Sequence, residues 1–136
     1  MVYVNHEELK RRTRSYYEEV LGRGNMSLID LLYADRIRVS DDECVSREQF
    51  KALVGRSITV FRDLAVQVRD QVAEGDRVVT RWTATGTQAG AFLGLPPGTR
   101  VEVSAIHIHQ FVDGRIAARW EEISSTRAPR GAGAVT

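Results

Sequence analysis

Hydrophobic and polar positions follow two different periods along the chain. Up to about residue 60, apolar side chains recur every three or four residues, as on one face of an amphipathic helix. This spacing predicts a helix over about residues 6–21, which Gly22-Arg23-Gly24 would end, and a short helix over about residues 28–32. Ser46 and Gln49 have the spacing of a capping box, so they predict the start of a third helix.

After Phe61 the period changes to two, which is typical of strands with one buried face. Val72 falls out of phase with the residues before it. The predicted strands cover about residues 64–72, 78–84, 101–112 and 115–123, with turns at Glu74-Gly75-Asp76 and Asp113-Gly114 and a glycine-rich loop over residues 86–98. Three helices followed by an antiparallel meander predict an α+β domain, and a long curved sheet covered by helices leaves a cavity at its wide end.

Composition narrows the class of protein. The chain has 136 residues with 43% hydrophobic and 27% charged side chains, which fits one globular domain over residues 1–125 and a flexible tail over residues 126–136. The net charge of +1 gives no reason to expect nucleic acid or a membrane surface as a partner. Cys44 is the single cysteine, and the first residues lack the pattern of a signal peptide, so we expect a cytoplasmic protein.

Three motifs in the second half point to one family. They are TATGT at residues 83–87, GAFLGLPP at residues 90–97 and FVDGRI at residues 111–116. With the opening YYEEVLGRGNMSLIDLLYAD, they make residues 7–124 similar to the SnoaL-like polyketide cyclases of the nuclear-transport-factor-2-like superfamily. The resemblance implies a conical barrel in which a strongly curved antiparallel sheet wraps over about three N-terminal helices and encloses an apolar pocket.

The resemblance also implies two catalytic residues. In the cyclases a histidine lies six residues before the Asp of the hairpin turn and an aspartate lies eight residues after it. Those positions here are His107 and Glu121. Glutamate in place of aspartate keeps the charge and adds one methylene of reach, so acid–base chemistry is implied more firmly than the same substrate.

The hairpin register decides whether these two side chains share a face, and the sequence leaves two registers open. A two-residue turn places His107 opposite Trp120 and turns Glu121 to the other face. A glycine bulge at Gly114 places His107 opposite Arg119, so that His107 and Glu121 lie on one face. The resemblance favours the bulged register.

In the expected mechanism, Glu121 removes a proton next to a substrate carbonyl, and apolar surroundings raise its proton affinity. His107 would lie across the pocket and stabilise the enolate oxygen. The expected wall of the substrate pocket contains Tyr16, Trp82, Phe92, Leu95, His109 and Trp120.

A metal site is the main alternative for the two hairpin histidines. His107 and His109 lie two residues apart in a strand, and Asp113 is a conceivable third ligand. Asp113 is explained better as the turn residue before Gly114, so we expect no metal and no other cofactor.

Three classes of function therefore stay open. The favoured one is a cofactor-independent cyclase or proton-transfer isomerase that acts on a carbonyl-bearing, polyketide-like intermediate as a homodimer or larger homo-oligomer. The second is a cofactor-free hydroxylase or a hydrolase of the same family. The third is a small-molecule-binding domain without chemistry, because this fold hosts both enzymes and binding domains.

Overall fold

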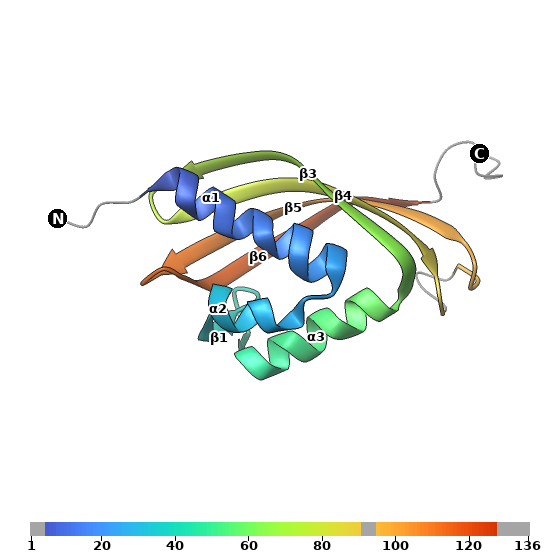
Figure 1. Cartoon of the computed structure of the whole chain (residues 1–136), viewed down its shortest axis with the longest axis horizontal. Coiled ribbons are helices and arrows are strands. Elements are labelled where there is room, and N and C mark those ends of the chain that lie inside the picture. The colour runs from blue at the N-terminus through green and yellow to red at the C-terminus, as the bar shows by residue number, and fades with distance from the viewer. Residues whose placement is uncertain (1–4, 91–94, 128–136) are drawn as a thin grey trace.

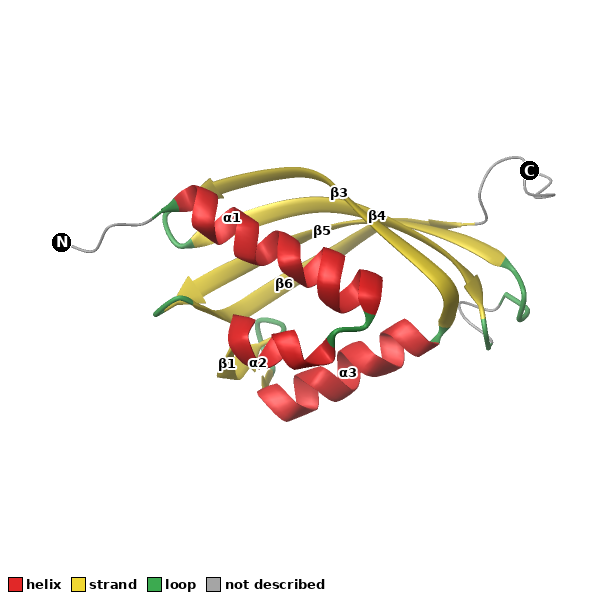
Figure 2. Cartoon of the chain, viewed as in Figure 1, coloured by secondary structure: helices red, strands yellow, loops and turns green. Residues whose placement is uncertain are grey.

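A single curved sheet forms the larger layer of the molecule (Figures 1 and 2). The computed structural model describes residues 5–90 and 95–127. Within them the strand order is β2-β1-β6-β5-β4-β3. The strands are β1 (Tyr33–Arg38), β2 (Cys44–Ser46), β3 (Phe61–Glu74), β4 (Arg77–Gln88), β5 (Arg100–Val112) and β6 (Arg115–Arg127). β1 runs parallel to β6 and every other described pairing is antiparallel, so β2 and β3 remain as edges and the sheet does not close into a complete barrel.

The helices all cover the same face of this sheet (Figure 1). They are α1 (His6–Ser15), its π-helical continuation η1 (Tyr16–Leu21), the 3₁₀ turn η2 (Met26–Leu28), α2 (Ile29–Leu32) and α3 (Arg47–Thr59). The α+β fold with helices over a strongly curved sheet is therefore confirmed. The predicted first helix also has the right extent, but its last six residues are π-helical.

The core lies between the two layers. Fully buried side chains from both layers meet there, among them Val20, Ile29, Ile37, Phe50 and Val78. Apolar faces of both layers meet there, which removes their surface from water and supplies most of the stability of the fold.

Local hydrogen bonds fix where the helices begin. Asn5 Oδ1 accepts from the backbone N–H of Glu8 at 3.1 Å, at the start of α1. The predicted capping box is confirmed, because Ser46 Oγ accepts from Gln49 N at 3.1 Å and Gln49 Oε1 accepts from Ser46 N at 2.8 Å. These bonds satisfy backbone donors that the first turn of a helix cannot pair internally.

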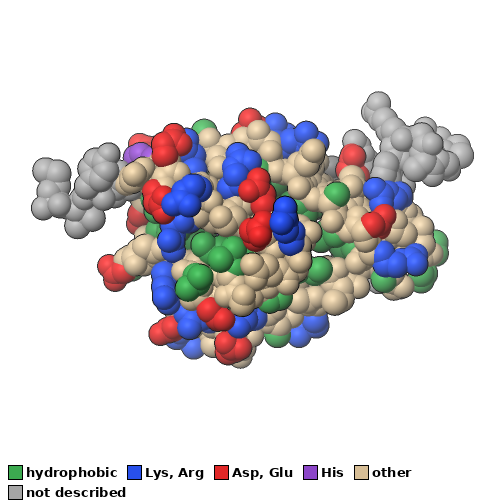
Figure 3. Space-filling view, in the orientation of Figure 1, with side chains coloured by type: hydrophobic (Ala, Val, Ile, Leu, Met, Phe, Trp, Pro, Cys, Tyr) green, Lys and Arg blue, Asp and Glu red, His purple; other side chains and the backbone are tan. Residues whose placement is uncertain are grey.

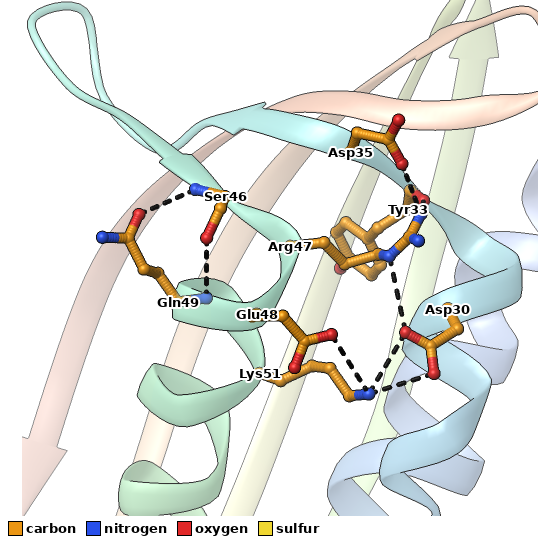
Figure 4. Close-up of polar contacts among 8 residues, drawn as sticks. All are labelled: Asp30, Tyr33, Asp35, Ser46, Arg47, Glu48, Gln49 and Lys51. Atoms are coloured by element: carbon orange, nitrogen blue, oxygen red, sulfur yellow. Dashed lines mark hydrogen bonds and ion pairs between the residues drawn. The ribbon is translucent and has the colours of Figure 1, made fainter.

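An ion cluster ties the start of α3 to its neighbours (Figure 4). Arg47 pairs with Asp30 of α2 at 3.4 Å and with Asp35 of β1 at 3.1 Å, and it donates to the Tyr33 carbonyl at 3.1 Å. Lys51 adds a second pair to Asp30 at 3.0 Å. Because one cation reaches both α2 and β1, the cluster sets the position of α3 against the sheet.

Two details of the strands differ from the sequence pattern. Arg69 is an extra residue in β3, since Val68 pairs with Trp82 while Asp70 pairs with Arg81. This bulge explains why Val72 is out of phase with the apolar residues before it. Val72 is 63% exposed, while Gln71 turns inward.

The glycine-rich loop was predicted to begin at residue 86, which is too early, because β4 continues to Gln88. Gly86 makes this continuation possible, since a Cβ there would lie 3.0 Å from Cβ of Phe61. Phe92, which was expected to line the substrate pocket, lies outside the described residues.

Charges of both signs are interspersed over the helical face (Figure 3). In the part of the chain that the structure describes, no helix combines the length and the apolar character needed to cross a membrane.

Replacing the cap of α3 tests the local account of this helix. Ser46→Ala removes the oxygen that accepts from Gln49 N, so we expect a loss of about 1 kcal/mol in the free energy of unfolding, measured by urea denaturation. Ser57→Ala is the matched control, because that hydroxyl only bonds back to the Leu53 carbonyl inside the same helix. Equal stability of Ser46→Ala and the wild-type chain would contradict the capping role.

Candidate active site

A bulge in β6 brings His107 and Glu121 together. Asp113 and Gly114 form a two-residue turn with φ angles of 51° and 81°, and Phe111 pairs with Ile116. Ala117 is then an extra residue, so Gln110 pairs with Ala118 and His107 lies directly opposite Glu121. Neither register taken from the sequence is correct, since the bulge lies at Ala117 and not at Gly114. The two side chains nevertheless share the face that the helices cover.

The two side chains touch each other. His107 Nε2 lies 2.7 Å from Glu121 Oε2, which is the distance of a strong hydrogen bond to a charged acceptor. The His107 side chain is 1% exposed, whereas that of Glu121 is 37% exposed. The sequence led us to expect His107 across a substrate pocket from Glu121. Instead, the buried His107 ring contacts the Glu121 carboxylate directly.

Tyr17 is the second partner of His107, and the sequence analysis missed it. Its hydroxyl lies 2.7 Å from His107 Nδ1. Of the adjacent tyrosines, Tyr16 was expected to face the pocket, yet both are buried, at 3% and 0% exposure. The helical spacing of Tyr17 and Val20 was the signal in the sequence that placed Tyr17 on the buried face.

A mostly apolar cavity of about 410 Å³ opens beside Glu121, between α3 and strands β3 to β6. A volume of this size is typical of a small-molecule site. Its lining side chains come from η1, α3 and the four long strands: Leu21, Leu53, Arg56, Ser57, Ile58, Val60, Phe61, Leu64, Val66, Trp82, Ala84, Val103, Glu121 and Ile123. Glu121 is the only carboxylate among them, and Arg56 is the only cation.

Of the predicted pocket residues, only Trp82 lines this cavity among those that the structure describes. Its ring lies 5.3 Å from that of His107, which does not line the cavity. Tyr16 and His109 are buried in the core beside His107 and do not line the cavity. Leu95 is half-buried elsewhere.

Trp120 lies on the opposite face of the sheet, because it neighbours Glu121 in a strand whose side chains alternate. Its indole N–H donates to Asp41 Oδ1 at 3.0 Å, and the Arg77 guanidinium lies 5.1 Å from the centre of its ring. The expectation that Trp120 lines the pocket is therefore wrong, because Trp120 and Glu121 are neighbours in the strand and point to opposite faces.

Burial and hydrogen bonding set the charges of the pair. Desolvation lowers the pKa of His107 to about 4, so its ring is neutral near pH 7. The hydrogen bond from His107 lowers the pKa of Glu121 and outweighs the desolvation that raises it. The expected rise in the proton affinity of Glu121 is therefore wrong for the free protein, and its carboxylate is charged at neutral pH.

Arg119 is a further member of the site, which the sequence analysis placed in the hairpin but gave no role. Its Nη2 lies 2.6 Å from His107 Nε2 and 3.5 Å from Glu121 Oε2, and its guanidinium lies over the Phe50 ring. Arg119 is opposite His109 in the β5–β6 ladder, so it projects into the core. It offsets the negative charge of Glu121 inside the protein.

The arrangement around His109 gives no support to a metal site. His109 is fully buried, with the rings of Tyr16, Tyr33 and His107 within 6.4 Å of its own. Over residues 5–90 and 95–127, no three His, Cys, Asp or Glu side chains gather closely enough to hold a metal ion.

Known structures share this fold. A proposed polyketide cyclase from Acidithiobacillus ferrooxidans is 22% identical to this chain. The two structures have a TM-score of 0.78 over 91% of this chain and 92% of that chain. AclR from Streptomyces galilaeus, a proposed hydroxylase, is 30% identical, with a TM-score of 0.74 over 88% of this chain and 80% of that chain. IdmH from Streptomyces antibioticus, a proposed polyketide cyclase, is 26% identical, with a TM-score of 0.72 over 85% of this chain and 91% of that chain. A comparison with curated proteins returned no match.

The fold is thus of the nuclear-transport-factor-2-like α+β class, with a carboxylate at the wall of its cavity. The family model described as SnoaL-like polyketide cyclase matches residues 11–127. The chain belongs to the SnoaL-like polyketide cyclase family.

The buried neutral histidine predicts a pH-dependent stability. An unfolded chain protonates His107 near pH 6.5, whereas the folded chain resists protonation until about pH 4. The unfolded state therefore binds more protons in this window, and stability falls as the pH falls through it. A shift of this size corresponds to about 3 kcal/mol, and the lowered pKa values of His109 and Glu121 act in the same direction.

Urea denaturation at several pH values between neutral and mildly acidic measures this slope. His107→Asn should reduce the slope, because it removes the ring whose protonation the folded state opposes. A wild-type stability that stays constant from neutral pH down to about pH 5 would show that His107 is not held neutral by burial.

Proposed function

We propose that the chain catalyses ring closure, or a related proton-transfer isomerisation, of a carbonyl-bearing polyketide-like intermediate, with Glu121 as the general base. One observation carries the proposal. A single carboxylate, Glu121, lines an otherwise mostly apolar cavity of about 410 Å³ and is fixed there by His107. Membership of the cyclase family supports the same reaction class.

In the proposed reaction, Glu121 takes a proton from the carbon next to a substrate carbonyl. The resulting enolate carbon attacks a second carbonyl of the same molecule, one carbon–carbon bond forms, and the new alkoxide takes the proton back from Glu121. A substrate that fills the cavity removes water from the carboxylate. This desolvation raises the pKa of Glu121 and makes it a stronger base than in the free protein.

His107 has a different role from the one that the sequence suggested. Its side chain is 1% exposed and does not line the cavity, so a substrate in the cavity meets Glu121 first. We assign it as a positioning residue, which donates from Nε2 to Glu121 Oε2 and keeps that oxygen in one place.

A cofactor-free hydroxylase is the second candidate, because the proposed hydroxylase AclR is 30% identical to this chain. The same base could form an enolate that reacts with dioxygen. Turnover in the absence of oxygen, or a product without label after turnover under labelled dioxygen, would exclude this alternative. Homo-oligomer formation and a cytoplasmic location stay predictions from the sequence.

The base assignment can be tested with an aromatic bicyclic ketone such as β-tetralone. Wild-type protein should accelerate exchange of the acidic protons of the ketone for deuterium, followed by NMR. Glu121→Gln removes the base but keeps the hydrogen bond from His107, so exchange should fall at least about 100-fold while the fold is retained.

Glu122→Gln is the matched control, because it makes the same charge change one residue along, on the other face of the sheet. Exchange at the wild-type rate in Glu121→Gln would refute the assignment. A ketone that binds tightly while its protons exchange no faster than in buffer would favour a binding domain without chemistry.

A further inference from the structure

We infer that the cavity takes a substrate that carries a carboxylate, and that Arg56 is the residue that recognises this anionic group. Arg56 is then a specificity-determining residue, which selects anionic carbonyl compounds over neutral ones and decides which end of the molecule reaches Glu121. That the bound carboxylate is the substrate of a reaction rests on the proposed function, whereas its binding to Arg56 does not.

Arg56 belongs to a stripe of α3 that borders the cavity. The lining residues from this helix and its C-cap that share the stripe are Leu53, Arg56, Ser57 and Val60. They are three or four residues apart, so they follow one another along one side of the helix. Phe50 and Val54 are buried and lie on a different stripe, which packs into the core. The helix therefore uses one side for the core and another, with a guanidinium on it, for the cavity.

The guanidinium of Arg56 has no partner in the part of the chain that the structure describes, residues 5–90 and 95–127. The residues outside these ranges include no Asp or Glu. By contrast, Arg47 at the start of the same helix pairs with both Asp30 and Asp35. The N–H donors of Arg56 are therefore available to a ligand.

Glu121 does not need the charge of Arg56. The hydrogen bond from His107 and the positive charge of Arg119 lower the pKa of Glu121, and Arg119 lies 3.5 Å from its Oε2. The His107 ring is neutral near pH 7, because burial lowers its pKa to about 4. Glu121 thus has a cation of its own, and the positive charge of Arg56 stays uncompensated at the cavity. It favours a ligand with a negative charge.

The exposure of the lining residues fits a ligand with an apolar body and a charged end. Trp82 and Ala84 are 8% and 6% exposed and form the floor of the cavity, whereas Leu53 and Ile123 are 40% and 56% exposed and form its mouth. Arg56 is exposed as well. An apolar body on the floor leaves water, while an anion at the mouth keeps part of its hydration. The planar fork of an arginine matches the two oxygens of a carboxylate.

The two charged residues of the wall also orient the substrate. Arg56 comes from α3 and Glu121 from β6, and both line the same cavity. A ligand carboxylate beside Glu121 would meet a like charge, whereas beside Arg56 it meets an opposite charge. The anionic end therefore lies toward α3, and the carbon that loses a proton lies toward Glu121.

A role in the helix itself is the competing explanation of Arg56. It lies in the last turn of α3, where a cation interacts favourably with the negative end of the helix dipole. In that case Arg56 would contribute to stability and not to binding, so experiments can separate the two roles.

Binding of β-naphthoate and β-naphthamide tests the inference. The two probes have nearly the same size and shape, but only the first is an anion at neutral pH. NMR can follow the two indole N–H signals, because Trp82 lines the cavity and Trp120 lies on the opposite face of the sheet. Wild-type protein should bind β-naphthoate more tightly than β-naphthamide, and binding should shift the Trp82 signal and not that of Trp120.

Arg56→Gln should weaken the binding of β-naphthoate about 10-fold and leave that of β-naphthamide unchanged, because only the anion loses a charge-assisted pair. Arg56→Lys keeps the charge without the fork, so its preference for the anion should be intermediate. Arg36→Gln is the matched control, since it makes the same change at an exposed arginine of β1 that does not line the cavity. It should bind both probes as the wild type does.

Equal affinity of the wild type for the two probes, or binding of neither, would overturn the inference. So would a folded Arg56→Gln protein that is less stable but binds β-naphthoate as tightly as the wild type, which is the result expected of a helix-end role alone.

None of these measurements requires turnover, so they stand even if Glu121→Gln shows that the proposed reaction is wrong. If the reaction is right, a β-tetralone with a carboxylate on its aromatic ring should exchange its protons with a lower KM than β-tetralone itself. Arg56→Gln should abolish this difference in KM and leave kcat unchanged, because the anion is held away from the base.

Discussion

The hydrogen bond between the buried ring of His107 and the carboxylate of Glu121 is the interaction on which the rest of the site depends. Burial keeps the ring neutral, with a pKa near 4, and the ring in turn lowers the pKa of Glu121. A charged carboxylate at the wall of an apolar cavity is costly unless it is paired in this way. The protein therefore keeps Glu121 ready to accept a proton without giving up its place beside the cavity.

A single-residue bulge builds this arrangement. Ala117 in β6 places Glu121 opposite His107. Since side chains alternate along a strand, one extra residue moves all later side chains to the other face. The helices then close the same face, so that Tyr17 of η1 reaches His107 and α3 covers the cavity.

The sequence predicted the helices and the four long strands well because their signals are local, but it did not predict the short strands β1 and β2. Apolar spacing located the helices and long strands, and the Ser46–Gln49 box and the Asp113-Gly114 turn are read from a few neighbouring residues. The resemblance to the cyclases also indicated His107 and Glu121. The bulge at Arg69 showed only as the change of phase at Val72, and the bulge at Ala117 has no signal of its own, because alanine is an ordinary residue in a strand. The contacts of His107 with Glu121 and with Tyr17 depend on strand register and on packing between segments far apart in the chain, so the sequence did not predict them.

Neutron diffraction from crystals of the deuterated protein would test the central claim most directly, since it locates hydrogen positions in the core. The account predicts density for a deuterium between His107 Nε2 and Glu121 Oε2, and another between the Tyr17 oxygen and Nδ1, on the Tyr17 side. A Glu121 side chain turned into solvent, or a deuterium on Nδ1 with none on Nε2, would contradict it.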